Sequence, residues 1–329
     1  MRFLLDEEQR EFARSLDGML TAAGTPAVVR AWSAGDHGPG RALWARVANA
    51  GVFALAVPEE HDGLSVHLVE LTVAFTELGR HVVPGPLVET VAVAALLDRL
   101  DDTALAEAWL PGIVSGETAA SLCLLTPGSP YALDADAADA VFVVTEDTLR
   151  VAESAGPVQP SADPARRLAR PLGGTVLARG PAVRTAAAHA ADIAALAAAA
   201  QALGLGRALL DRTVDHVKQR TQFGRPIGAF QAVKHRLADV LIALEFAQPL
   251  VYAAALSLTD GGPDSPRAVA AAKLAAGEAA YGAARAALQC HGALGYTGEL
   301  DLSLWIRKAR ALRTAWGTPA DCRARVLQD

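Results

Sequence analysis

The residues with the most distinctive chemistry lie together at positions 220 to 231, which read RTQFGRPIGAFQ. They interrupt an alanine-rich stretch with a helical pattern. A turn that only reversed the chain would not need two arginines, two glutamines and two phenylalanines. Arginine offers a fork of donors to phosphate, phenylalanine offers a flat apolar surface, and glycine lets a backbone approach a ligand closely. The segment therefore has the chemistry to hold an anionic, partly flat molecule.

Simpler roles are open to each of these residues when it is considered alone. Arg220 could be a cation that complements the dipole at a helix C-terminus, and Phe223 could be a core residue. Gln231 could replace an N-terminal cap at the start of the following helix.

The elements around this segment are mainly helical, and one stretch is rich in strand signals. Apolar residues at helical spacing predict helices over 40–50, 65–80, 86–110, 192–219, 267–289 and 299–315, with a capping box at Asp6 and Gln9 opening the first helix. Pro111 is expected to end one helix, and Pro249 to end or kink another. Short β-rich runs at 121–125, 140–144 and 175–178 predict strands. We expect a helical domain (1–118), a small β domain (119–184) and a helical bundle (185–329).

Composition excludes several classes of function. A net charge of −6, without basic runs interleaved with aromatics, argues against a nucleic-acid partner. The acidic N-terminus lacks the pattern of a signal peptide, and the apolar stretch 186–210 is interrupted by polar residues, so it is interpreted as a buried helix and not a membrane span. Cys123, Cys290 and Cys322 lack metal-ligand spacing, so we expect free thiols, no metal and a cytoplasmic location.

The segment RTQFGRPIGAFQAVKHRLAD, together with the order of the domains, resembles the acyl-CoA dehydrogenase family. Three further stretches support the resemblance: LWARVANAGVFALAVPEEHDGLS, LDADAADAVFVV and QCHGALGYTGELDLSLWIRKAR. The resemblance implies a mainly α fold with a reduced β-barrel or sheet domain and a C-terminal four-helix bundle. It also implies FAD as the cofactor and an acyl-CoA thioester as the substrate.

In that family, the turn and a later glutamine-containing joint reach across a subunit interface and hold the adenine and pyrophosphate end of a neighbour's FAD. By this match the candidate FAD contacts are Arg220, Gln222, Phe223, Gln231, Gln289, Gly292 and Thr318. Ala293 replaces the second glycine of the joint.

The catalytic glutamate of the family is missing at both of its usual places. Trp316, in the turn AWGT, stands where one glutamate should be, and tryptophan cannot accept a proton. Ala194 occupies the other position, on the first helix of the bundle. Asp192 is a weak candidate because two residues correspond to about 200° around a helix, and it could instead be a charge near a helix N-terminus. Glu245 and Glu299 are poorer candidates, each with a simpler solvated or helix-pairing role.

The β region is also reduced. A flavin-contacting loop of the family is represented only by LTPGSPYA (125–132), where Thr126 and Ser129 could bind a ligand but more simply serve a turn. No tryptophan between Trp109 and Trp305 could stack on a flavin ring. The groups that would serve the chain's own flavin are degraded, whereas those that would serve a neighbour's flavin are kept.

Three hypotheses follow. In the first, the chain is the non-catalytic half of a hetero-oligomeric acyl-CoA dehydrogenase, with a partner that carries the glutamate; a fatty acyl or a bulky steroid side chain would suit it. In the second, it is a self-associating dehydrogenase with a relocated base. In the third, it is a flavin-free helical binding or scaffold protein. The family implies an electron-transferring flavoprotein as the electron acceptor.

Overall fold

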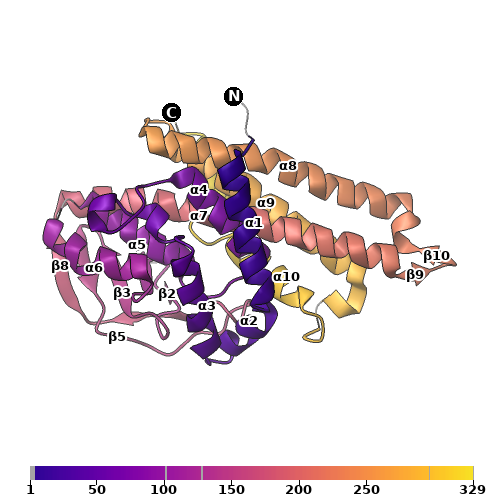
Figure 1. The fold of residues 1–329 in the computed structure, drawn as a ribbon, viewed down its shortest axis with the longest axis horizontal. Coiled ribbons are helices and arrows are strands. Elements are labelled where there is room, and N and C mark those ends of the chain that lie inside the picture. Colours follow the sequence, from indigo (N-terminus) through magenta and orange to yellow (C-terminus); the bar gives the residue numbers. More distant parts are fainter. Residues whose placement is uncertain (1–3, 101, 127–128, 296, 329) are drawn as a thin grey trace. The chain divides into compact units, whose positions relative to one another are not determined.

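The computed structural model describes residues 4–100, 102–126, 129–295 and 297–328. Helices dominate them (Figure 1). The α-helices are α1 (Glu7–Ala22), α2 (Thr25–Ser33), α3 (Gly38–Asn49), α4 (Leu68–Arg80), α5 (Leu87–Arg99), α6 (Thr103–Ser115), α7 (Pro181–Gln219), α8 (Gln231–Asp260), α9 (Ser265–His291), α10 (Leu302–Leu312) and α11 (Pro319–Val326). Short 3-10 turns are η1 (Ala54–Ala56), η2 (Glu59–His61), η3 (Ile227–Ala229) and η4 (Gly292–Gly295).

The strands lie mostly between α6 and α7. They are β1 (Ala120–Leu124), β2 (Ala132–Leu133), β3 (Ala140–Thr145), β4 (Thr148–Val151), β5 (Ser154–Ala155), β6 (Leu168–Ala169), β7 (Pro171–Leu172), β8 (Thr175–Arg179), β9 (Thr221–Gln222) and β10 (Arg225–Pro226). One sheet has the order β1-β3-β4-β8, with β1 parallel to β3 and the other pairs antiparallel. The three strands predicted at 121–125, 140–144 and 175–178 are confirmed, and so is a mainly α fold with a small β region.

The chain divides into two compact units. Unit 1 comprises 1–26, 72–83 and 195–329, and unit 2 comprises 27–71 and 84–194. These units do not follow the three sequence domains, whose boundaries stay a prediction.

One predicted helix end is wrong. Pro111 lies inside α6, and the predicted helix 86–110 is instead two helices, α5 and α6. The break comes earlier because the Asp102 side chain caps α6 by accepting the N–H of Leu105, and α6 continues to Gly116, whose φ of 78° suits a helix end. For Pro249 the prediction was a helix end or a kink. Helix α8 continues to Asp260, so the end does not occur and the kink stays a prediction.

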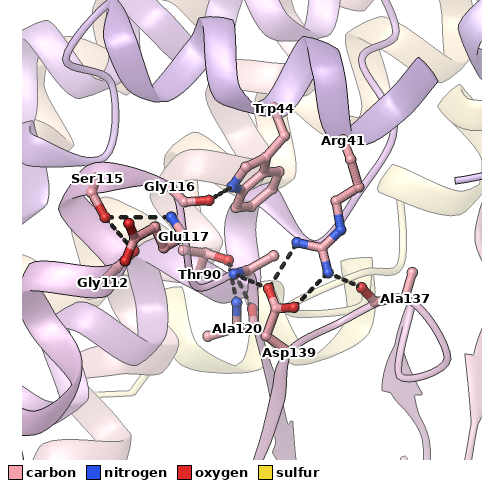
Figure 2. Close-up of polar contacts among 11 residues, drawn as sticks. Arg41, Trp44, Thr90, Gly112, Ser115, Gly116, Glu117, Ala120, Ala137 and Asp139 are labelled. Atoms are coloured by element: carbon pink, nitrogen blue, oxygen red, sulfur yellow. Dashed lines mark hydrogen bonds and ion pairs between the residues drawn. The ribbon is translucent and has the colours of Figure 1, made fainter. Parts of the chain in front are cut away.

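Unit 2 ties its N-terminal helices to the sheet through polar contacts (Figure 2). Arg41 of α3 forms a two-pronged ion pair with Asp139, with N–O distances of 2.7 and 2.9 Å, and Asp139 also accepts the Ala119 N–H next to β1. Thr90 of α5 exchanges two hydrogen bonds with the backbone of Ala120. These bonds fix where β1 begins.

Unit 1 contains a close helix crossing between α4 and α7. A Cβ built on Gly79 would lie 2.0 Å from the Gln201 carbonyl oxygen, and one on Gly204 would lie 1.8 Å from the Thr76 oxygen. Both distances are far below van der Waals contact, so only glycine allows the two backbones to touch.

Two helices, α7 and α8, are long and apolar enough to span a membrane by length and composition alone. The most apolar window of α7 is 94% buried inside the protein, as in the core helix of a folded domain, which agrees with the predicted buried helix over 186–210. The corresponding window of α8 is only 39% buried, which leaves an apolar face uncovered.

Candidate functional site

The turn that interrupts the bundle is a short β-hairpin at the ends of α7 and α8 (Figure 1). Strands β9 and β10 pair antiparallel, with Gln222 opposite Arg225. The two residues between them, Phe223 and Gly224, have φ of 53° and 76°, as in the tight turns that favour hairpins. Positive φ is uncommon for phenylalanine, so the backbone holds this side chain in a costly conformation.

The Phe223 side chain is 91% exposed, so its alternative role as a core residue is wrong. Its ring meets that of Phe230 edge to face, with centroids 6.2 Å apart, and the Arg225 guanidinium stacks over Phe230 at 4.2 Å. The Ile227 N–H donates to the Arg220 carbonyl at 2.8 Å and closes the hairpin. The hairpin therefore presents aromatic and guanidinium surface to the outside.

Arg220, Gln222 and Gln231 are also exposed. Arg220 follows the last residue of α7, so a role as a helix-terminal cation is compatible with its place. Gln231 is the first residue of α8, and the preceding residue, Phe230, is the N-cap and makes no side-chain cap. Gln231 is therefore not the predicted cap substitute, and the positive end of the 30-residue helix α8 lacks a side-chain cap.

The structure brings the glutamine-containing joint to the same end of the bundle. Gln289 is exposed near the end of α9, which stops at His291, and Gly292 follows with φ of 61°. The His291 ring stacks on that of His216, one turn before Arg220, with centroids 3.8 Å apart. Burial lowers the pKa of both imidazoles, and for His216 the neighbouring His291 and Arg220 lower the pKa further.

Thr318 lies elsewhere, as the N-cap of α11. It forms a capping box with Asp321: the Thr318 hydroxyl accepts the Asp321 N–H at 3.2 Å and donates to its carboxylate at 2.6 Å. The hydroxyl bond, together with a bond from the Thr318 N–H to the same carboxylate at 3.1 Å, lowers the pKa of Asp321. The Thr318 hydroxyl therefore already has a local structural role, in the cap of α11.

A buried lysine fixes the turn that contains Trp316, where one glutamate of the family was expected. Lys273 of α9 is 1% exposed, and its ammonium donates to the carbonyls of Leu312, Arg313 and Gly317 at 3.0, 3.4 and 3.3 Å. Trp316 is partly buried and has a positive φ of 54°. No acid stands in this turn.

The second family position also lacks an acid. Ala194 is fully buried on α7. Asp192 is buried in the fourth turn of a helix that begins at Pro181, so its alternative role as a charge at the helix N-terminus is wrong. Asp192 interacts with His189, whose pKa burial lowers.

The other sequence candidates have simple roles. Glu245 pairs with Arg207 at 2.9 Å, and Glu299 is exposed in a loop. Thr126 accepts the N–H of Ser129 at 3.1 Å, which agrees with a turn; Pro127 and Gly128 lie outside the described residues.

Sequence reasoning missed three buried carboxylates, Glu89, Asp134 and Asp163. Glu89 of α5 is 6% exposed and lies among the buried residues Leu87 to Leu97. An acid inside the apolar run LVETVAVAALL was the signal that could have identified it.

Comparisons with known proteins place these features in context. The family models described as acyl-CoA dehydrogenase N-terminal and C-terminal domains match residues 6–117 and 179–326. Acyl-CoA dehydrogenase IpdE2 of Mycobacterium tuberculosis is 34% identical over 326 residues, covering 97% of this chain and 96% of that protein.

Two solved structures have similar folds. A variant of the steroid ACAD Tcur3481-Tcur3483 is 25% identical, with a TM-score of 0.84, covering 97% of this chain and 96% of that one. The ChsE4-ChsE5 complex from Mycobacterium tuberculosis is 22% identical, with a TM-score of 0.85, covering 99% and 98%.

Proposed function

Because the chain belongs to the acyl-CoA dehydrogenase family, we propose that it is the non-catalytic subunit of a hetero-oligomeric acyl-CoA dehydrogenase. It donates contacts to FAD held by a partner subunit that carries the base. One observation carries the proposal: the hairpin groups that suit a flavin are exposed, whereas Trp316 and Ala194 leave both base positions without a carboxylate.

The exposed end of the bundle fits the adenine and pyrophosphate part of FAD. In the described part of the chain no carboxylate pairs with the Arg220 guanidinium, so its N–H groups can donate to phosphate oxygens. Phe223 offers a flat surface to a ring system, and Gln222, Gln231 and Gln289 offer amide groups. The N-terminus of α8 adds a favourable field for an anion.

FAD, when bound, accepts the hydride that leaves the β-carbon of the acyl thioester. This chain's residues bind and orient the remote end of the cofactor, and the acid that removes the α-proton comes from the partner. The role of Thr318 as a further contact rests on the family match, because its hydroxyl is engaged in the cap of α11.

The uncovered face of α8 supports a place in an assembly. Leu241, Ile242, Phe246 and Leu250 follow one another along this helix and are exposed, with Phe246 at 72%. A run of large apolar side chains on a surface marks an interaction site. The partner is a base-carrying acyl-CoA dehydrogenase subunit, and self-association is the alternative.

The similar proteins support the same proposal. The ChsE4-ChsE5 structure is described as a complex, and Tcur3481-Tcur3483 is described as a steroid ACAD. By analogy we propose an acyl-CoA thioester with a bulky or steroid-derived acyl group, an electron-transferring flavoprotein as the acceptor, and a cytoplasmic location.

The test begins with the visible spectrum of the chain purified alone and then co-expressed with a base-carrying relative. We expect colourless protein alone and stoichiometric flavin in the complex. Arg220→Gln should weaken flavin retention by about 10- to 100-fold, because one charge-assisted contact to phosphate contributes about 1.5–3 kcal/mol. Arg14→Gln, an exposed arginine change on α1, is the control with the same loss of charge.

Two other outcomes would replace the proposal. Flavin that binds to the chain alone and bleaches when acyl-CoA is added would identify a self-sufficient enzyme with a relocated base. In that case Glu89→Gln and Asp192→Asn are the first variants to make, because both carboxylates are buried. A complex without flavin, unaffected by Arg220→Gln, would identify a scaffold protein.

A further inference from the structure

A hollow in unit 1 lies between α4, α7 and α8 and has no part in the proposed flavin contacts. Its volume is about 400 Å³, and its lining includes Glu77, Arg80, Arg207, Gln248 and Tyr252. Glu245, also in the lining, is 14 residues along α8 from Gln231, or about 20 Å of helix. The hollow is therefore separate from the hairpin.

Two guanidiniums dominate the lining. Arg207 donates through Nη2 to the Glu245 carboxylate at 2.9 Å and to the Gln248 side-chain oxygen. Arg80 donates through Nη1 to Asp211 at 2.8 Å. A guanidinium has five N–H donors, so each arginine keeps donors for a further acceptor. Both side chains stay positively charged at neutral pH and are only partly exposed to solvent in the hollow.

Glu77 provides the acid of the hollow and has an unusual environment. Burial raises its pKa to about 7, against the lowering effect of Arg80 and Arg207 and with a further raising effect of Asp17. Its Oε2 makes no hydrogen bond within the described residues and lies 3.5 Å from Nε of Arg80. Asp17 is itself paired with His81 at 2.7 Å. Near neutral pH, Glu77 therefore exchanges easily between carboxylate and carboxylic acid.

The charges select the class of ligand. With Glu77 protonated, the two guanidiniums face two carboxylates, Glu245 in the lining and Asp211 beside Arg80, and Glu77 becomes an O–H donor. Gln248 and the buried Tyr252 add neutral polar groups, and Gln248 Nε2 lies 3.5 Å from the Tyr252 oxygen. A compact anion satisfies these donors, whereas a cation would meet two guanidiniums.

We propose that the hollow between α4, α7 and α8 is a binding site for a compact oxyanion, the carboxylate or phosphoryl group of a small metabolite, held by Arg80 and Arg207. Glu77 binds in its protonated form and donates to the anion. The affinity is constant at acidic pH and falls as pH rises through the titration of Glu77, by at most tenfold per pH unit for one linked proton.

The test is isothermal titration of the full-length chain with sodium butyrate and with inorganic phosphate, against sodium chloride at matched ionic strength. We expect saturable binding of at least one oxyanion, tighter at pH 6 than at pH 8. Butyrate alone would identify a carboxylate ligand, phosphate alone a phosphoryl ligand, and both the shared chemistry. No binding tighter than about 10 mM at pH 6 would overturn the proposal.

The oxyanion affinities of four variants distinguish binding at this hollow from non-specific effects of ions on the protein. Arg207→Gln should weaken binding at least about tenfold, since a charge-assisted bond is lost, whereas Arg285→Gln, an exposed arginine change on α9, should leave it unchanged. Glu77→Gln keeps a donor and should retain binding while removing its pH dependence. Tyr252→Phe removes one buried hydroxyl with little change in shape, so a weaker affinity there does not reflect misfolding. Equal affinities in all four variants would contradict the site.

A divalent cation is the competing occupant. Ligand-type atoms of Asp17, Glu77 and His81 lie within 4.8 Å of one another. Titration with Mn²⁺ distinguishes the two cases: tight Mn²⁺ binding that Glu77→Gln abolishes would overturn the oxyanion proposal. No Mn²⁺ binding, with oxyanion binding retained, supports it. Neither result depends on flavin, so this proposal and the proposed function fail separately.

Discussion

The hairpin end of unit 1 and the turn at 312–318 differ in how their polar groups are used. At the hairpin, Arg220 and Phe223 are exposed, and a costly positive φ holds the Phe223 ring outward. At the turn, backbone carbonyl groups accept hydrogen bonds from the buried Lys273 ammonium. Trp316 stands where the family's catalytic glutamate was expected. In the proposed function the exposed hairpin groups contact a neighbouring molecule, whereas the polar groups of the turn are used within the chain's own packing.

The largest expected effect comes from removing the lysine that holds the turn. Lys273→Met should lower the free energy of unfolding by about 3 kcal/mol or more, because three carbonyls lose a charged donor in a buried place. Urea denaturation measures the change. Lys234→Met, at an exposed position on α8, is the control and should change stability by less than about 0.5 kcal/mol. A cost below about 1 kcal/mol for Lys273→Met would show that the turn does not depend on this ammonium.

A matched pair of glycine substitutions tests the same contrast in the backbone. Gly317 has φ of 125°, and a Cβ there would lie 3.1 Å from the Cys322 sulfur, so Gly317→Ala should cost about 2 kcal/mol. Gly224 has φ of 76° with open space around it, so Gly224→Ala should cost only about 1 kcal/mol. Thermal unfolding of both variants gives the comparison, and equal costs would contradict the difference between the regions.

A smaller effect is expected from the exposed ring of the hairpin and rests on the proposed function. Phe223→Ala should weaken flavin binding in the complex by about 5- to 10-fold, since an aromatic contact contributes about 1 kcal/mol. The stability of the chain alone should not change, because the ring is 91% exposed. Leu327→Ala, at an 81% exposed side chain, is the control for loss of apolar surface. Flavin titration measures the affinity, and an unchanged value would remove Phe223 from the contacts.

The smallest effect concerns the histidine stack behind the hairpin. The pKa values of His216 and His291 are lowered in the folded chain, so folding favours the neutral rings. Their contribution to stability is complete above the ordinary histidine pKa of about 6.5 and is lost as pH falls below it. His37 and His189 in unit 2 follow the same direction.

The contribution of the two histidines is therefore measured by comparing the free energy of unfolding between pH 7.5 and pH 5 in the unchanged chain and in a double variant. The double change His216→Gln and His291→Gln should make the loss of stability on acidification smaller than in the unchanged chain. An identical pH profile would mean that these rings titrate alike in the folded and unfolded states.

Much of the fold was predictable because local signals agree with the final structure. The capping box of Asp6 and Gln9 opens α1 as predicted, and the short runs predicted as strands, SLCLL, AVFVV and TVLA, form β1, β3 and β8. Tertiary packing overrides local signals elsewhere. Pro111 and Pro249 lie inside helices, where the cost of a lost backbone bond is offset by burial of the surrounding helix faces.

The candidate site was predictable only in part. The sequence indicated the residue types of the hairpin, but it left open whether Phe223 was buried, because exposure depends on the turn conformation. It did not indicate that Lys273 reaches a turn about 40 residues away, a contact that follows from the packing of α9 on α10. The hollow between α4, α7 and α8 was not predicted either, because its side chains come from three helices that are distant in the sequence.

The crossing of α4 and α7 provides a way to lower the amount of folded protein by a single substitution. Gly79 and Gly204 are hidden where two backbones touch, so even one added methyl group at either position would force the helices apart. Such an allele would deplete the folded chain while leaving the residues of the hairpin and the turn unchanged. The hollow is not spared, because a methyl group at Gly204 would meet the backbone of Thr76 and Arg80, which line it. A strain that carries it would separate the cell's need for the folded protein from its need for the individual contacts of the hairpin.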